Sequence, residues 1–202
     1  MNNKRVYECY LAGPIFFEGD LYRTQHWVKK LNEEFGETLN IYAPLLNTEI
    51  NGIEGKKRFA DARMIADADN KRLDKSDILI ACIDGDVLPS GTCAEIGKFH
   101  EKIARGDKKH IVGICTDNRQ CYLTHSKEKD EGGSASSGNQ QYSYQNIYVT
   151  GLIKEYGELY FTIDEVIEDI KKWIASQETP KVMKGQISFS EKAAHKISEY
   201  NF

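Results

Sequence analysis

The chain has 202 residues, of which 40% are hydrophobic and 29% charged, enough for one well-buried core but short for two. Its 27 Lys and Arg against 31 Asp and Glu give a formal net charge of -4, so the composition indicates neither a nucleic-acid nor an anionic-membrane partner. The polar start and the lack of an apolar stretch long enough to cross a bilayer lead us to expect a cytoplasmic protein.

Strand and helix patterns alternate along the sequence. In chain order they predict a strand at 6–12, a helix at 21–35, a strand at 39–43, a helix at 58–75, a strand at 78–83, a helix at 93–104, a strand at 110–115, a strand-like segment at 158–161 and a helix at 163–176. Residues 45–57 form a polar loop, and residues 124–144 are rich in Gly and Ser and predict a mobile loop. We expect one domain over 1–178 and an appended segment over 179–202 that contains a possible helix at 190–199.

The run at 78–83 (ILIACI) is apolar on both faces, which is typical of a central strand in a parallel sheet covered by helices on each side. Alternating strands and helices with short connections predict a doubly wound α/β fold with a flavodoxin-like sheet of five parallel strands. In that strand order the first and third strands are neighbours, and ligands bind at their carboxyl ends. Gly13-Pro14 and Asp84-Gly85 are therefore expected to meet at the binding crevice.

The loop after the third predicted strand contains a candidate nucleophile. Ser90-Gly91-Thr92 predicts a turn and a helix N-cap, which places Glu95 on the first helical turn, where the positive end of the helix dipole favours an ionised carboxylate. An ionised carboxylate can attack carbon. The alternative interpretation is structural, because T-x-x-E is also the signature of a capping box.

Two loops together carry a family resemblance. Residues 10–17 read YLAGPIFF, and residues 84–97 read DGDVLPSGTCAEIG. These resemble the YLAGP(F)F and DG…(D)SGTxxExG loops of the nucleoside 2-deoxyribosyltransferase family. Residues 146–151 (NIYVTG) are similar to the family's N-x-x-x-x-G segment, so the resemblance spans residues 6–173.

The resemblance implies an enzyme that exchanges the base of a 2-deoxynucleoside through a covalent deoxyribosyl-enzyme. It implies that Glu95 is the nucleophile, that Asp69 binds sugar hydroxyls and that Tyr10 orients Glu95. The residues expected to bind substrate are Gly13, Phe16, Asp84, Asp86, Ser90, Gly91 and Asn146. Phe16 offers an apolar face on which a base can stack. Asn146 is implied to reach the site of a neighbouring subunit, so a homo-oligomer is expected, with a nucleoside and a free base as small-molecule partners.

One position departs from the family pattern. Pro89 stands where many members have an Asp that is implied to contact and help protonate the base. A leaving base needs a proton donor or a hydrogen-bond partner as its bond to C1′ breaks. Asp84 or Asp86 can substitute for the missing Asp, but both are also ordinary residues of an acidic turn.

Three other functions remain open from the sequence. A nucleoside or nucleotide N-glycosidase uses the same chemistry with water as acceptor; the nucleotide form needs a basic group for a 5′-phosphate, for which Arg23 and Arg63 are candidates. A noncatalytic nucleotide-binding or TIR-like module is the third alternative. No cofactor is expected, because neither a dinucleotide fingerprint nor a P-loop occurs, and the five cysteines and scattered histidines indicate no metal site.

Overall fold

The computed structural model describes residues 5–47, 61–85, 87–117 and 145–178. The strands are β1 (Tyr7–Ala12), β2 (Leu39–Tyr42), β3 (Ile78–Cys82), β4 (His110–Ile114) and β5 (Glu158–Tyr160). The helices are α1 (Glu18–Phe35), α2 (Ala62–Lys75), α3 (Ser90–Ala104), α5 (Ile147–Tyr156) and α6 (Ile163–Glu178), with single 3-10 turns at Gly36–Thr38 and Pro44–Leu46.

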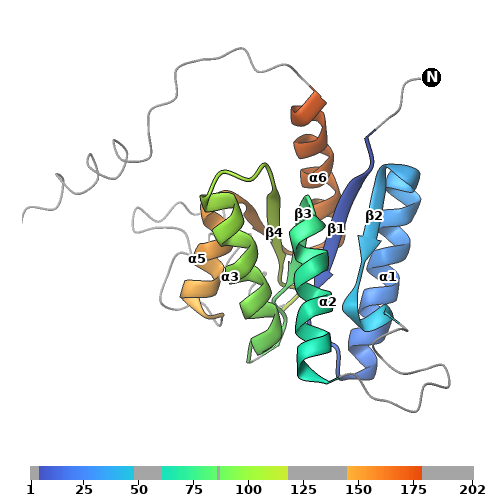
Figure 1. Cartoon of the computed structure of the whole chain (residues 1–202). Coiled ribbons are helices and arrows are strands. Elements are labelled where there is room, and N and C mark those ends of the chain that lie inside the picture. The colour runs from blue at the N-terminus through green and yellow to red at the C-terminus, as the bar shows by residue number, and fades with distance from the viewer. Residues whose placement is uncertain (1–4, 48–60, 86, 118–144, 179–202) are drawn as a thin grey trace, which may run out of the picture. The chain divides into compact units, whose positions relative to one another are not determined.

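The five strands form one parallel sheet in the order β2-β1-β3-β4-β5 (Figure 1). This is the flavodoxin-like order, so the predicted fold class is confirmed. The apolar run predicted as a central strand is β3, which is buried along its whole length between β1 and β4.

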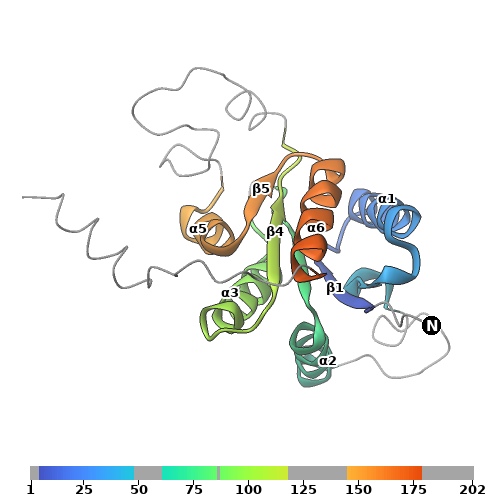
Figure 2. The same ribbon diagram turned by 90° about the horizontal axis from the view of Figure 1, so that it is seen from above.

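Helices cover both faces of the sheet (Figure 2). α2, α3 and α5 lie on one face, and α1 and the beginning of α6 lie on the other, where Lys30 and Asp164 form an ion pair at 2.6 Å. The buried cluster beneath α2, α3 and α5 combines alternate residues of the strands with apolar helix residues; it includes Tyr10, Ala12, Leu73, Leu79, Ala81, Ile96, Phe99, Ile111 and Ile153. Tyr10 therefore points toward α2 and α3, which determines where a site can form.

The carboxyl ends of the strands lie at the edge of the sheet where α1, α2 and α3 begin (Figure 1). There the loop after β1 passes close to the end of β3. A Cβ atom on Gly13 would come within 2.8 Å of the Cβ atom of Cys82, which is closer than real Cβ contacts allow. Gly13 is needed because its backbone packs against β3 with no room for a side chain.

Two helices begin earlier than the sequence patterns predict. α1 begins at Glu18 rather than at residue 21, because the Asp20 carboxylate accepts a hydrogen bond from the Phe17 backbone N–H at 3.0 Å and stabilises the first turn. α3 begins at Ser90 rather than at residue 93. The predicted start of α2 at residue 58 lies outside the described residues, and the helix begins at Ala62 with Asp61 as its N-cap.

The chain divides into two compact units, Met1–Ile170 and Lys171–Phe202. The expected boundary between 178 and 179 stays a prediction. The loop expected to be mobile at 124–144, most of the polar loop at 45–57 and the possible helix at 190–199 lie outside the described residues. Within the described residues, no helix is long and apolar enough to cross a membrane.

Candidate active site

Tyr10 and Glu95 form a direct hydrogen bond between β1 and α3. The Tyr10 side chain is completely buried, and its hydroxyl donates to Oε1 of Glu95 at 2.6 Å. Burial and the neighbouring charge of Glu95 raise the pKa of Tyr10 far above its usual value of 10.0. Tyr10 therefore keeps its proton and acts as a donor that holds the Glu95 carboxylate in one orientation.

Glu95 lies on the second turn of α3, not on the first. Pro89 is the N-cap, so Ser90 is the first helical residue and Thr92 lies inside the helix, where it cannot be the N-cap of a capping box. The pKa of Glu95 is raised from 4.5 to about 7, because burial removes water from the carboxylate and the charge of Asp69 adds to the effect, while the hydrogen bond from Tyr10 opposes it. Burial therefore makes the ionised form of Glu95 less favourable than a position near the start of a helix leads one to expect.

Asp69 faces the same site from α2. Its carboxylate is partly buried, and Tyr42 on β2 donates to Oδ1 at 3.5 Å. Burial raises the pKa of Asp69, while hydrogen bonds from Tyr10 and Tyr42 work in the opposite direction. Two carboxyl groups and a tyrosine hydroxyl from three different elements thus meet at one end of the sheet.

The loop after β1 is fixed by the first turns of α1. Arg23 donates from Nη2 to the Pro14 carbonyl oxygen at 3.2 Å and forms an ion pair with Asp20 at 3.1 Å. Asp20 in turn accepts from the Phe17 N–H. With its backbone fixed in this way, the loop leaves Phe16 87% exposed, which suits contact with a ligand or another molecule.

The loop after β3 contains two of the predicted acidic site residues, Asp84 and Asp86, of which the structure describes only Asp84. The Asp84 carboxylate accepts from the Thr116 backbone N–H at 2.5 Å and from the Thr116 hydroxyl at 2.8 Å, so it joins the ends of β3 and β4. Asp86 lies outside the described residues. Ser90 and Gly91 are the exposed first residues of α3. Substrate binding by these four residues stays a prediction.

Asn146 is the N-cap of α5. Its side-chain oxygen accepts from the backbone N–H groups of Tyr148 at 3.0 Å and Val149 at 3.2 Å. This hydrogen bonding explains why an Asn is suited to the position within one chain. A role in the site of a neighbouring subunit stays a prediction.

Tyr42 and Asn47 are site neighbours that the sequence motifs do not predict. Tyr42 lies directly opposite Tyr10 in the parallel register of β1 and β2, and Asn47 donates to the Tyr42 hydroxyl at 3.0 Å. A usable signal was present, because both strands carry a Tyr toward their carboxyl ends and neighbouring parallel strands present such residues at the same edge.

Residues 9–161 match the family described as "Nucleoside 2-deoxyribosyltransferase". The chain belongs to this family. Membership indicates a glycosyltransferase-type enzyme of nucleoside metabolism, for which nucleosides are fitting substrates. The residues that meet at the candidate site all lie inside the matched range.

Solved structures agree in fold. A conserved protein from Enterococcus faecalis V583 is 27% identical, with a TM-score of 0.62, over 83% of this chain and 98% of that one. A 2-desoxiribosyltransferase from Leishmania mexicana is 18% identical, with a TM-score of 0.50, over 84% and 97%. A 2-deoxyribosyltransferase from Bacillus psychrosaccharolyticus is 14% identical, with a TM-score of 0.52, over 82% and 95%. The chain matched no curated protein.

A metal site has no candidate among the described residues, which contain no group of three or more His, Cys, Asp or Glu side chains placed to hold an ion.

The raised pKa of Glu95 predicts an effect on stability. Because the folded protein binds this proton more tightly than the unfolded chain, the free energy of unfolding falls as pH rises from 4.5 to about 7. Glu95→Gln removes the titration but keeps an acceptor for Tyr10. After allowance for partial exposure, we expect it to raise the free energy of unfolding by about 2 kcal/mol at pH 8.

Urea denaturation at pH 8 and pH 4 measures this effect. The difference between Glu95→Gln and the unmodified protein should disappear at pH 4, where the carboxyl is protonated in both states. Glu101→Gln is the matched control, because Glu101 lies on the same helix with a side chain that is 57% exposed. A Glu95→Gln variant that is no more stable at pH 8 would contradict the desolvation argument.

Proposed function

We propose that this protein is a nucleoside 2-deoxyribosyltransferase that moves 2-deoxyribose from one base to another through a deoxyribosyl-Glu95 intermediate. The observation that carries the proposal is the Tyr10–Glu95 hydrogen bond at 2.6 Å, with Asp69 beside it. A carboxylate held by a protonated tyrosine is oriented for attack, and a second carboxylate is available to bind the sugar. Family membership supports the same chemistry.

In the first step, Glu95 attacks C1′ as the bond between C1′ and the base nitrogen breaks, through a transition state with oxocarbenium character. The electron pair of that bond leaves with the base, which takes up a proton. In the second step, a nitrogen of the incoming base attacks C1′, loses a proton and releases Glu95. Two displacements retain the configuration at C1′.

The site residues divide this work. Glu95 is the nucleophile, Tyr10 orients it, and Asp69 accepts hydrogen bonds from sugar hydroxyls. Phe16 provides a face for stacking, supported by its exposure on a backbone fixed by α1. Asp86 is our candidate for the base proton, because Pro89 has replaced the family Asp and the Asp84 carboxylate is bonded to Thr116.

We further propose a homo-oligomer in which Asn146 contributes to a neighbouring site. Support comes from the apolar side chains next to it, since Ile147 is 39% exposed and Tyr148 is 74% exposed. Exposed aromatic and aliphatic groups beside a polar residue are typical of contact surfaces.

The contacts of Arg23 count against it as the partner of a 5′-phosphate, which leaves the exposed Arg63 as the other candidate for nucleotide binding. A 5′-phosphate needs a free cationic partner, and two nitrogens of the Arg23 guanidinium are used by the Pro14 carbonyl and by Asp20. These contacts give Arg23 a structural role in stabilising the loop after β1.

Chromatography of deoxyinosine incubated with the protein and free adenine or cytosine tests the proposal. We expect a new deoxynucleoside that contains the added base. Hypoxanthine and free deoxyribose alone would instead show a hydrolase, and no turnover of deoxynucleosides or their monophosphates would overturn the proposed chemistry.

A further inference from the structure

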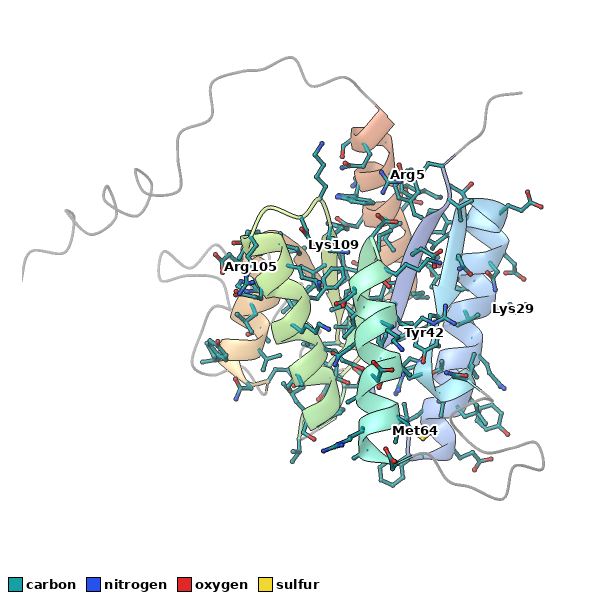
Figure 3. The ribbon with its side chains drawn as sticks, viewed as in Figure 1. Arg5, Lys29, Tyr42, Met64, Arg105 and Lys109 are labelled. Atoms are coloured by element: carbon teal, nitrogen blue, oxygen red, sulfur yellow. The ribbon has the colours of Figure 1, made fainter. Side chains whose placement is uncertain are left out.

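Tyr42 is held from two sides beside the candidate site. Its ring lies 5.3 Å from the ring of Tyr10, centroid to centroid, and the planes meet at 52°. The guanidinium of Arg72 on α2 lies 4.8 Å from the centroid of the Tyr42 ring. Figure 3 labels Tyr42 beside α2. Aromatic and cation–π contacts of this kind restrict the rotation of the ring and so fix the position of its hydroxyl.

The hydrogen bonds of the Tyr42 hydroxyl have a fixed direction. Nδ2 of Asn47 can only donate, so the hydroxyl oxygen accepts from it at 3.0 Å. The single proton of the hydroxyl then points to Oδ1 of Asp69, at 3.5 Å. This distance is long for a hydrogen bond, and such contacts in unliganded sites tighten when substrate binds.

We propose that Tyr42 is a positioning residue for Asp69, directed by Asn47 and Arg72 so that its hydroxyl proton keeps the Asp69 carboxylate in place as an acceptor for a sugar hydroxyl. The inference rests on the proposed function, in which Asp69 binds the sugar. It goes beyond that function because it assigns a positioning role to Tyr42, Asn47 and Arg72, which do not touch the reacting atoms.

The surroundings of Asp69 explain why such support is needed. Burial makes the ionised form of Asp69 unfavourable, and the charge of Asp69 in turn raises the pKa of Glu95 on α3. The groups that oppose the effect of burial on Asp69 are the hydroxyls of Tyr10 from β1 and Tyr42 from β2. Tyr10 also donates to Glu95 at 2.6 Å, so its one proton is shared between the two carboxyl groups. The proton of Tyr42, in contrast, is directed to Asp69.

Tyr42→Phe tests the proposal. It removes the hydroxyl and keeps the ring between Tyr10 and Arg72. Without its donor, Asp69 should bind a proton more readily, so its pKa should rise. We expect kcat/KM for base exchange to fall about tenfold, mainly through KM, and the loss to be smaller at high pH than at low pH, because Asp69 binds a proton more readily in the variant.

Tyr160→Phe is the matched control. The Tyr160 hydroxyl donates to Oδ1 of Asp169 at 2.7 Å, so this substitution removes the same type of contact on β5. It should leave kcat/KM and its pH dependence unchanged. A loss of activity in Tyr42→Phe that is uniform across pH would show a merely structural role and would overturn the proposal.

A double-mutant cycle with Asn47 tests the direction of the hydrogen bonds. Asn47→Ala frees the Tyr42 hydroxyl to rotate, and we expect it to lower kcat/KM at pH 6 by about threefold. Because Asn47 acts through that hydroxyl, the double variant should be no worse than Tyr42→Phe alone. Additive losses would show that Asn47 acts independently and would remove it from the proposal.

NMR titration of the Asp69 side-chain carboxyl in the full chain separates this inference from the proposed function. A higher pKa in Tyr42→Phe than in the unmodified protein supports the inference, even if neither protein exchanges bases. An unchanged pKa overturns it, even if the unmodified protein is an active transferase.

Discussion

Replacement of Glu95 by alanine should lower the rate of base exchange by at least about 1,000-fold, because the reaction loses the atom that forms the bond to C1′. The structure supports this choice of nucleophile through the hydrogen bond from Tyr10 and the partial burial of the carboxylate. Glu95→Gln should be equally impaired. It keeps the shape of the side chain and an acceptor for Tyr10, but an amide oxygen is a poor nucleophile.

Intact-protein mass spectrometry after a rapid denaturing quench provides a second measurement. A deoxyribosyl adduct should form on the unmodified protein incubated with deoxynucleoside, and neither Glu95 variant should carry it. Glu101→Ala is the control, because Glu101 lies on the exposed side of the same helix, paired with Arg105 at 2.7 Å. An adduct on Glu95→Ala would place the nucleophile elsewhere.

The strands and loops that position Glu95 could be predicted from the sequence. Hydrophobic runs separated by Gly, Pro and Asp predict the central strands, since the runs of β3 and β4 are buried on both faces of the sheet. The strand order then brings the loops after β1 and β3 together, where Gly13 packs against Cys82. Local patterns and the general rule for strand order in this fold class are together sufficient here.

The raised pKa of Glu95, in contrast, could not be predicted from the sequence. The local signal of Ser90-Gly91-Thr92 predicts a later helix start, whereas Pro89 is the N-cap and the helix begins at Ser90. The raised pKa of Glu95 depends on its burial in the folded protein and on the charge of Asp69, which is 26 positions away in sequence. No local pattern encodes either contribution.

Tyr42 illustrates the same limit. The proposed role of Tyr42 depends on three contacts, with Tyr10 on β1 and with Asp69 and Arg72 on α2. Sequence alone identifies a Tyr at the end of a short strand. The register of β1 and β2 places it opposite Tyr10, and this pairing is a property of the assembled sheet.

The activity should depend steeply on pH below neutrality. Glu95 attacks only when ionised, and its pKa is raised to about 7. We therefore expect kcat/KM to rise about tenfold per pH unit up to a bend near 7, so that the value at pH 5 is roughly 100-fold below the plateau. A solvated carboxylate would bend near 4.5 instead. Initial rates of base exchange from pH 4.5 to 9 locate the bend.

Asp69→Asn identifies the cause of the bend. Because the charge of Asp69 raises the pKa of Glu95, its removal should move the bend to lower pH, even though the absolute rate also falls through weaker sugar binding. Asp67→Asn is the control on the same helix, since Asp67 is 64% exposed and pairs with Lys71 at 2.6 Å. The two carboxyls titrate as a pair, so the bend reports their coupling. A bend that stays near 7 in Asp69→Asn would attribute the raised pKa to burial alone.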